Sequence, residues 1–578
     1  MRVLEKTLEK ELAPVHYPDG PVHDGRGRWD GDQGPDGREP QSPGPSRSQS
    51  GTWRRWIFSG SALLIVSLAI GAVSHGLNIF SYPLYITDEG VYMQQAWSVL
   101  RQAKLSPYTY FYDHAPGGWL FIAAWVRLLP FQLETFGNAI NTGRVLMVLV
   151  HLASVFLLFR ITHRLSGSLT AAFAAAFFFN VSPLAIFYQR QVLLDNIMVL
   201  WVLFSLYLAT GSNKGVMIPM LSGMALGVAA LTKENAVFFT PIIGFLLYTK
   251  VHRKPNYRFA LGFWAFSFIA SVSLYFLYAT LKDELFPTGL DFDPNNPPAD
   301  HVSLLYTLWW QLHRSQGSVL DPSSLFWEFS LNRWIPKDVL VLAAGAVAML
   351  ANLVIGLLDR RRYRGYLVAA ALALGYTFYL IRGSLILEFY VVPLIPFLAM
   401  NIGMLAARLL DYLPALGRGF VLTALFGVLL FHPIWGYTLQ IDEFGKVVTH
   451  DLYKLDLTYL QAQQVEFIRE NIPPNAKIVM DDDLWVALHD VRPYYRFAHS
   501  HWKVSADPDV RDKLFAKNWR NIDYFVMSNR MLITMQQNNG DGRYDWILEA
   551  LNSAKLIWSG ERPGGPGGSG VRLEIYQV

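Results

Sequence analysis

Long apolar runs separated by short polar stretches make up most of this chain. Eleven of them reach or approach the roughly 20 residues that an α-helix needs to cross a bilayer. The predicted crossings are residues 57–79, 138–162, 168–188, 194–211, 216–232, 235–251, 259–280, 338–358, 366–381, 387–406 and 419–437. A further run, 117–130, is too short to cross and is predicted to be an interfacial or re-entrant helix. The pattern predicts a polytopic α-helical membrane protein.

Basic residues lie in alternate connections between the predicted crossings. They are Arg160–Arg164, Lys214, Lys250–Arg258, Arg360–Arg364 and Arg408–Arg418. Because Lys and Arg concentrate in cytoplasmic loops, we expect the N-terminus to be cytoplasmic and the C-terminus to lie outside. Loops 80–137 and 281–337 then face outward. Four tryptophans in loop 281–337 favour a helix in the outer leaflet, with a lipid or acceptor groove as the alternative.

The two ends of the chain differ from the apolar part in composition. Residues 1–52 are mostly poor in aliphatic side chains and are predicted to be a disordered cytoplasmic tail. The first crossing, which follows this tail, is predicted to be an uncleaved signal anchor. A transmembrane domain is expected over 53–437. In 438–578, an amphipathic helix at Leu460–Asn471 and strands at 476–480, 524–527 and 571–576 predict a small extracytoplasmic α/β domain.

An acidic run, Asp481–Asp483, follows the first strand of that C-terminal segment. It could bind a metal, but no histidine spacing or EF-hand pattern accompanies it. An acidic loop exposed to solvent is therefore the favoured interpretation, and no metal site is predicted.

Composition excludes several classes of protein and of catalytic site. The chain has 578 residues, 52% of them hydrophobic, which is too apolar for an ordinary soluble enzyme. A net charge of +4 calls for no nucleic-acid partner. The absence of cysteine excludes disulfides and a thiolate nucleophile. No nucleotide-binding glycine motif lies between a strand and a helix, so no cofactor is expected.

Charged residues and one tyrosine collect at the outer ends of the predicted crossings. Asp88 and Glu89 come first, and carboxylates at a membrane edge are costly and therefore candidates for function. The others are Asp113, His114, Arg144, Arg190, Asp195, Lys233, Glu234, Glu388 and Tyr390. A carboxylate can act as general base on an acceptor, and Arg or Lys can bind a lipid phosphate. The structural alternatives are an Arg190–Asp195 pair and snorkelling of Lys233 and Glu234.

Several of these residues stand in motifs of a known family. The motifs are Thr87-Asp88-Glu89-Gly90, Tyr112-Asp113-His114-Ala115-Pro116-Gly117-Gly118-Trp119, Asn141-Thr142-Gly143-Arg144, Ser182-Pro183-Leu184 with Arg190 and Leu194-Asp195-Asn196, Leu231-Thr232-Lys233-Glu234, and Phe389-Tyr390-Val391-Val392-Pro393. In this order they resemble the GT-C glycosyltransferases, and among these glycosyltransferase family 39, over residues 57–437. Two departures are Ala115, where the family often has proline, and Glu388, where relatives often have arginine.

The resemblance implies a membrane enzyme that transfers a sugar with inversion from a polyprenyl-phosphate carrier. It implies that Asp88 is the catalytic base with Glu89 beside it, and that Arg144, Arg190 and Lys233 bind the donor phosphate. We expect Asp113, His114, Asp195, Glu234, Glu388 and Tyr390 to contact substrate. The acceptor, whether protein, lipid or glycan, stays open. The alternatives are a transporter or flippase of a lipid-linked intermediate and a membrane-anchored binding protein; a bacterial plasma membrane is the favoured location.

Overall fold

The computed structural model describes residues 60–578 except for several segments. Outside the described residues lie 212–214, 254, 288–302, 314–316, 384–385, 415–416, 418, 421–422, 424–426, 428–439, 442–446, 449–455, 538–543 and 563–570. The predicted tail at 1–52 and most of the predicted crossing at 419–437 therefore lie outside them as well.

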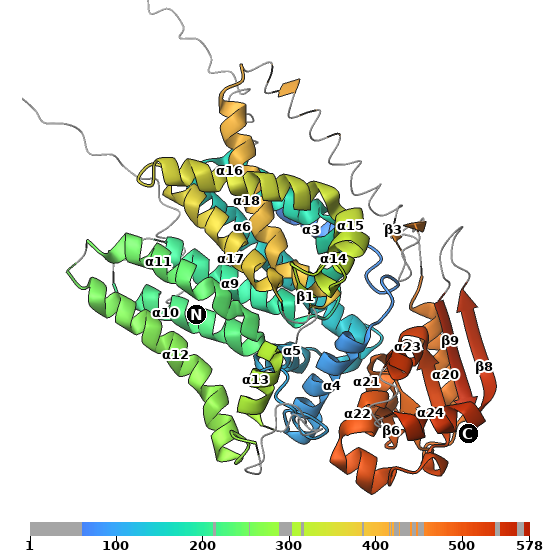
Figure 1. Cartoon of the computed structure of the whole chain (residues 1–578). Helices are drawn as coiled ribbons and strands as arrows, with labels where there is room; N and C mark the ends of the chain where they lie inside the picture. The colour runs from blue at the N-terminus through green and yellow to red at the C-terminus, as the bar shows by residue number, and fades with distance from the viewer. Residues whose placement is uncertain are drawn as a thin grey trace, which may run out of the picture. The chain divides into compact units, whose positions relative to one another are not determined.

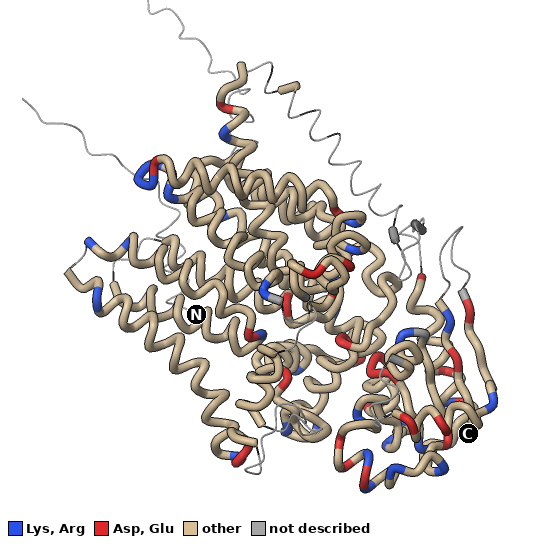
Figure 2. The backbone as a smooth tube through the Cα atoms, in the orientation of Figure 1, with Lys and Arg blue, Asp and Glu red and all other residues tan. Residues whose placement is uncertain are grey.

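The first two thirds of the described chain are helical (Figure 1). The apolar helices are α3 (Gly60–Gly76), α6 (Ala139–Ser166), α7 (Leu169–Val181), α8 (Pro183–Gln189), α9 (Leu194–Thr210), α10 (Met217–Thr232), α11 (Thr240–Val251), α12 (Tyr257–Leu281), α16 (Gly345–Leu358), α17 (Arg364–Ile381) and α18 (Ile395–Asp411). Figure 2 shows most of these helices free of charge along their length, with Lys, Arg, Asp and Glu near their ends. This distribution is the one a bilayer requires.

Five helical stretches in the described part are long and apolar enough to cross a membrane. They rise to six if α7 and α8, which meet at a bend of 62°, form one span, and α3, α9 and α10 are apolar but shorter. The prediction of a multi-pass membrane protein is confirmed. The count of eleven crossings and the orientation of the termini stay predictions.

Helices α10 and α12 pack closely because small residues line their contact. A Cβ at Gly223 would lie 2.2 Å from the carbonyl oxygen of Trp264. Ser267 also donates its hydroxyl hydrogen to the carbonyl of Met220 at 2.8 Å. Small residues let helix backbones approach in this way where lipid provides no hydrophobic driving force.

Interrupted helices produce the turns that carry the polar residues. Pro183 lacks an N–H and cannot continue α7, so the chain bends there and the Ser182 hydroxyl accepts from the amide of Ala185 at 3.2 Å to start α8. Helices α11 and α18 are each preceded by a short 3₁₀ helix, η2 (Glu234–Phe239) and η5 (Glu388–Leu394). The candidate site residues Glu234 and Glu388 are thereby placed at helix ends.

The loop predicted to face outward at 80–137 contains two helices, α4 (Thr87–Gln102) and α5 (Gly117–Arg127). The prediction of a short helix in the run 117–130 is confirmed, since α5 has only 11 residues. Its interfacial or re-entrant placement stays a prediction. In loop 281–337 the helix α13 (Leu304–His313) and the helical stretch from α14 (Leu325–Phe329) through α15 (Ile335–Val339) carry the four tryptophans.

The C-terminal segment contains a five-stranded sheet. Its elements are α20 (Tyr459–Asn471), β5 (Ile478–Met480), η6 (Asp482–Leu484), α21 (Trp485–Asp490), β6 (Ala498–Ser500), α22 (His501–Ala506), β7 (Tyr524–Ser528), α23 (Asn529–Gln537), α24 (Asp545–Ser553), β8 (Lys555–Arg562) and β9 (Val571–Gln577). The strand order is β6-β5-β7-β9-β8, with β6, β5 and β7 parallel and β9 antiparallel to both β7 and β8.

The predicted helix and the three predicted strands of this segment are present, whereas strands β6 and β8 were not predicted. The interpretation of Asp481–Asp483 as a solvent-exposed loop is wrong, because Asp481 and Asp482 are buried. The Asp482 carboxylate accepts hydrogen bonds from the Ser500 hydroxyl and from Trp502 Nε1. That the segment is a separate extracytoplasmic domain stays a prediction.

Candidate functional site

The first turn of α4 holds two neighbouring carboxylates in different surroundings. Asp88 and Glu89 both lie in the first turn of α4, but Asp88 is half-buried and Glu89 is fully buried. Acidic residues suit this position because the helix N-terminus carries a partial positive charge. The sequence grouped the two carboxylates as one catalytic pair, whereas the structure gives them separate partners.

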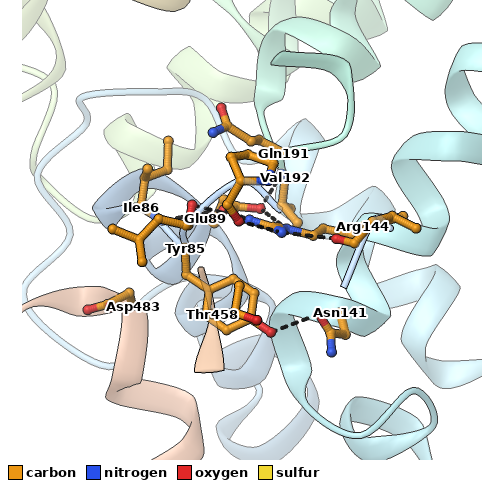
Figure 3. A network of polar contacts seen from close by, with 12 residues as sticks. Tyr85, Ile86, Glu89, Asn141, Arg144, Gln191, Val192, Thr458 and Asp483 are labelled. Carbon is orange, nitrogen blue, oxygen red and sulfur yellow. Dashed lines mark hydrogen bonds and ion pairs between the residues drawn. The ribbon is translucent and has the colours of Figure 1, made fainter. Parts of the chain in front are cut away.

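Glu89 forms a buried ion pair with Arg144 of α6 (Figure 3). Arg144 Nε donates to Glu89 Oε1 at 2.8 Å and Nη2 donates to Oε2 at 2.7 Å. Glu89 also accepts from the amides of Val192 at 3.0 Å and Ile86 at 3.3 Å. Four donors therefore surround this carboxylate, which fills the sites where it can accept hydrogen bonds.

Arg144 uses its remaining N–H groups on the loop before α4. They reach the carbonyl oxygens of Ile79 at 3.0 Å, Pro83 at 2.9 Å and Leu84 at 3.4 Å. A guanidinium has five N–H donors, and these contacts occupy all five. The predicted binding of donor phosphate by Arg144 stays untested, but this geometry favours a positioning role for Arg144 and Glu89.

Asp88 lies where charged groups from several separate segments converge. Burial raises the pKa of Asp88 above the usual range for an aspartate; electrostatic interactions with Arg530, Lys233 and His114 oppose that rise, and Asp195 adds to it. These groups come from α23, the end of α10, the turn before α5 and the start of α9. Of the residues expected to converge, Lys233, His114 and Asp195 act on Asp88. Arg530 was not predicted, because no motif in the sequence marks it.

Lys233 is held among an acid and two aromatic rings. Its Nζ lies 2.6 Å from Asp195 Oδ2, 4.2 Å from the centre of the Tyr390 ring and 4.9 Å from that of Phe389. The side chain is 2% exposed, so the alternative that Lys233 snorkels to the membrane surface is wrong. Asp195 pairs with this lysine, and Arg190 donates to the carbonyl of Ser74 at 2.7 Å.

Glu234 stabilises the turn that carries Asp113 and His114. Glu234 Oε1 accepts from the amide of Ala115 at 2.8 Å, and Oε2 lies 3.1 Å from His114 Nδ1. The carbonyl of Asp113 accepts from Gln311 Nε2 at 2.6 Å. Two turns that are distant in sequence are joined here by direct contacts.

Glu388 belongs to a neighbouring polar cluster. Lys337 Nζ donates to Glu388 Oε1 at 2.8 Å, the Tyr188 hydroxyl donates to the same oxygen, and Trp334 Nε1 donates to the backbone carbonyl of Glu388 at 2.7 Å. Lys337 was not predicted as a site residue, because it lies at the edge of an apolar run and belongs to no recognised motif.

The C-terminal segment contacts the start of α4, where Asp88 lies, and the loop before it. Thr87 Oγ1 donates to Asp481 Oδ1 at 2.8 Å. Gln461 makes two bonds to the backbone of Tyr85, accepting from its amide and donating to its carbonyl, both at 3.0 Å. The start of α4 is therefore held from one side by Arg144 and from the other by the C-terminal segment.

Comparisons with known proteins bear on this arrangement. A family model described as dolichyl-phosphate-mannose-protein mannosyltransferase matches residues 113–276. The structure of ArnT from Cupriavidus metallidurans bound to undecaprenyl phosphate is 14% identical with a TM-score of 0.53, and the match covers 91% of this chain and 98% of ArnT. No curated protein sequence gives a significant match.

A second similar structure is the oligosaccharyltransferase AglB from Archaeoglobus fulgidus in complex with an inhibitory peptide and a dolichol-phosphate. It is 12% identical with a TM-score of 0.53, and the match covers 89% of this chain and 74% of AglB. ArnT and AglB are GT-C glycosyltransferases, so the resemblance predicted from the sequence is confirmed. At these identities, the structural similarity establishes the fold.

Proposed function

We propose that this protein is an integral membrane glycosyltransferase that transfers a sugar, with inversion, from a polyprenyl-phosphate carrier to an acceptor on the outer face of the membrane. The observation that carries this proposal is the half-buried Asp88 at the start of α4, on which charged groups from four other segments act. A carboxylate in such surroundings is suited to proton abstraction at a site where anionic substrates bind.

In the proposed reaction Asp88 removes the proton from the acceptor hydroxyl or amine as the acceptor attacks the anomeric carbon. The bond between that carbon and the phosphate oxygen breaks, and polyprenyl phosphate leaves with the bonding electrons. A single displacement of this kind inverts the anomeric centre. Burial raises the pKa of Asp88, which makes its carboxylate a stronger base than an exposed one.

The relatives support the class of donor. ArnT was solved with undecaprenyl phosphate and AglB with dolichol-phosphate, and the matching family model is named for dolichyl-phosphate-mannose. All three are polyprenyl phosphates or their sugar conjugates. We extend that class to this chain and leave the sugar and the acceptor open. Lys233 and Arg190 stay candidates for the phosphate.

The test is donor consumption by purified protein in nanodiscs. Polyprenyl-phosphate mannose with a radiolabelled sugar is supplied with a solubilised envelope fraction as the source of acceptor, and other polyprenyl-phosphate sugars follow. Asp88→Asn should lower turnover by about 10²–10⁴-fold, the contribution typical of a general base. The matched control is Asp545→Asn, which removes an exposed acid in α24 and should leave turnover unchanged.

Each outcome separates the proposal from its alternative. Full turnover by Asp88→Asn would refute the assignment of the base. If the wild-type protein in nanodiscs bound the donor without cleaving it, and in sealed vesicles moved it across the bilayer, the flippase alternative would replace the transferase.

A further inference from the structure

The cations near the proposed site differ in whether a carboxylate already neutralises them. Among the described residues, three lysine or arginine side chains there are paired with a carboxylate: Arg144 with Glu89 at 2.7 Å, Lys233 with Asp195 at 2.6 Å and Lys337 with Glu388 at 2.8 Å. In each pair the lysine or arginine side chain is 7% exposed or less. A phosphate would have to compete with these carboxylates for cations that are largely buried.

Arg530 differs from all three in its surroundings. It lies in the first turn of α23 in the C-terminal segment, and its side chain is exposed. Among the residues that the structure describes, no carboxylate lies within ion-pair distance of its guanidinium. Because a guanidinium can donate two parallel hydrogen bonds to a phosphate, Arg530 is available to bind one.

A single carboxylate fixes where Arg530 lies relative to Asp88. Asp481 Oδ1 accepts from the hydroxyl of Thr87 at 2.8 Å, and Asp481 Oδ2 accepts from the hydroxyl of Ser528 at 3.2 Å. Thr87 immediately precedes Asp88. Ser528 precedes α23 and accepts from the amide of Met531 at 3.1 Å. The bridge Thr87–Asp481–Ser528 thus joins the first turn of α4 to the first turn of α23.

This bridge forms at the carboxyl ends of two parallel strands. Asp481 follows β5 and Ser528 ends β7, and the two strands are neighbours in the sheet. In α/β sheets that edge is where ligands bind. Here α4 packs against it closely: a Cβ at Gly90 would lie 2.2 Å from the carbonyl oxygen of Asp482.

Further contacts hold the C-terminal segment to α4. Asp490 accepts from Trp97 Nε1 at 2.7 Å and forms an ion pair with Arg101 at 2.8 Å. Trp485 packs edge-on against Trp97 with ring centres 5.0 Å apart. These contacts hold α21 of the C-terminal segment against the second half of α4.

We propose that the C-terminal segment completes the active site and that its Arg530 binds the phosphate of the lipid-phosphate donor. This inference rests on the proposed function and assigns the donor a contact outside the membrane helices. It also gives the segment a role in binding the donor rather than the acceptor.

Arg530 also influences the base. Four residues from separate elements act electrostatically on Asp88: Arg530 of α23, Lys233 at the end of α10, His114 in the turn before α5 and Asp195 of α9. Among those that lower the pKa of Asp88, Arg530 has the largest effect. A phosphate bound to Arg530 would offset that positive charge, so donor binding would raise the pKa of Asp88 and strengthen the base. Loss of Arg530 would move the acidic limb of the pH–rate profile to higher pH.

The experiment compares Arg530→Gln and Arg530→Lys with Arg496→Gln in the full chain. Arg496 is an exposed arginine of the same segment and serves as the matched control. The measurements are the dissociation constant for polyprenyl phosphate in nanodiscs, KM and kcat for the labelled donor, thermal stability and the pH–rate profile. Arg530→Gln should raise the dissociation constant about ten- to a hundredfold, as expected for a lost charged hydrogen bond.

Arg530→Lys should keep the acidic limb in place, because it retains the charge, while recovering only part of the affinity. If Arg530→Gln matches Arg496→Gln in affinity and pH profile while the wild type turns over donor, the inference fails and the proposed function stands. A wild type that neither binds nor consumes any polyprenyl-phosphate sugar would refute both. Lower stability of Arg530→Gln with unchanged affinity would reduce Arg530 to a structural residue.

Discussion

The ion pair between Glu89 and Arg144 offers a direct test of how the site is held. Both side chains are fully buried and the closest approach is 2.7 Å. At an effective dielectric constant of about 20, two unit charges at that separation attract by about 6 kcal/mol. Desolvation offsets much of this attraction. Removing one partner leaves the other charge buried and alone, and the expected loss in the free energy of unfolding is about 3–5 kcal/mol.

A double-mutant cycle measures the coupling. Glu89→Gln and Arg144→Gln should each lower the free energy of unfolding by about 3–5 kcal/mol. The double variant leaves no charge unpaired, so it should be at least about 2 kcal/mol more stable than the sum of the two single losses predicts. Unfolding is followed by tryptophan fluorescence during titration with denaturing detergent. The matched control is Glu470→Gln, an exposed glutamate at the end of α20, which should change stability little.

Two results would refute this reasoning. Losses that add within about 0.5 kcal/mol would show that the two residues are independent. If Glu89→Gln kept wild-type stability and lost turnover, Glu89 would be a catalytic residue, as the sequence first suggested, and its role in positioning the start of α4 would be wrong.

Two further predictions concern the docking of the C-terminal segment. Gly90→Ala gains about 0.5–1 kcal/mol of helix propensity, but its added Cβ would lie 2.2 Å from the carbonyl oxygen of Asp482. We therefore expect lower thermal stability and turnover than in the control Gly262→Ala, whose added Cβ meets no atom within 4 Å. Equal thermal stability of the two variants would contradict the close approach. Burial, and next the charge of Asp481, raise the pKa of Asp482 to about 7, so its contribution to stability is complete below about pH 4 and is lost as the pH rises through 7. The difference between a pKa of about 7 and the usual value near 4 corresponds to about 4 kcal/mol. Asp482→Asn should flatten the fall in melting temperature between about pH 4 and 7, and an unchanged slope in that range would contradict the assignment.

The helical part could be predicted from the sequence because a bilayer imposes a local rule. A helix that crosses it needs a continuous apolar run, and such runs are visible without knowing their neighbours. The polar turns at Asp88, His114, Asp195 and Lys233 were visible for the same reason, since charged residues stand out at the ends of apolar runs. Strands β6 and β8 escaped because three- and eight-residue strands without clear alternation have no comparable local signal.

Pairing within the site was decided by the tertiary structure alone. The sequence places Glu89 beside Asp88 and Asp195 near Arg190, yet the folded chain pairs Glu89 with Arg144 and Asp195 with Lys233. Asp481 contacts Thr87 across 394 residues of sequence, and Arg530 reaches the surroundings of Asp88 from α23. The sequence by itself therefore determined which residues lie at helix ends, because burial in lipid depends on local polarity. Which charge neutralises which depends on distances of a few ångströms between separate segments, and only the packing of those segments sets them.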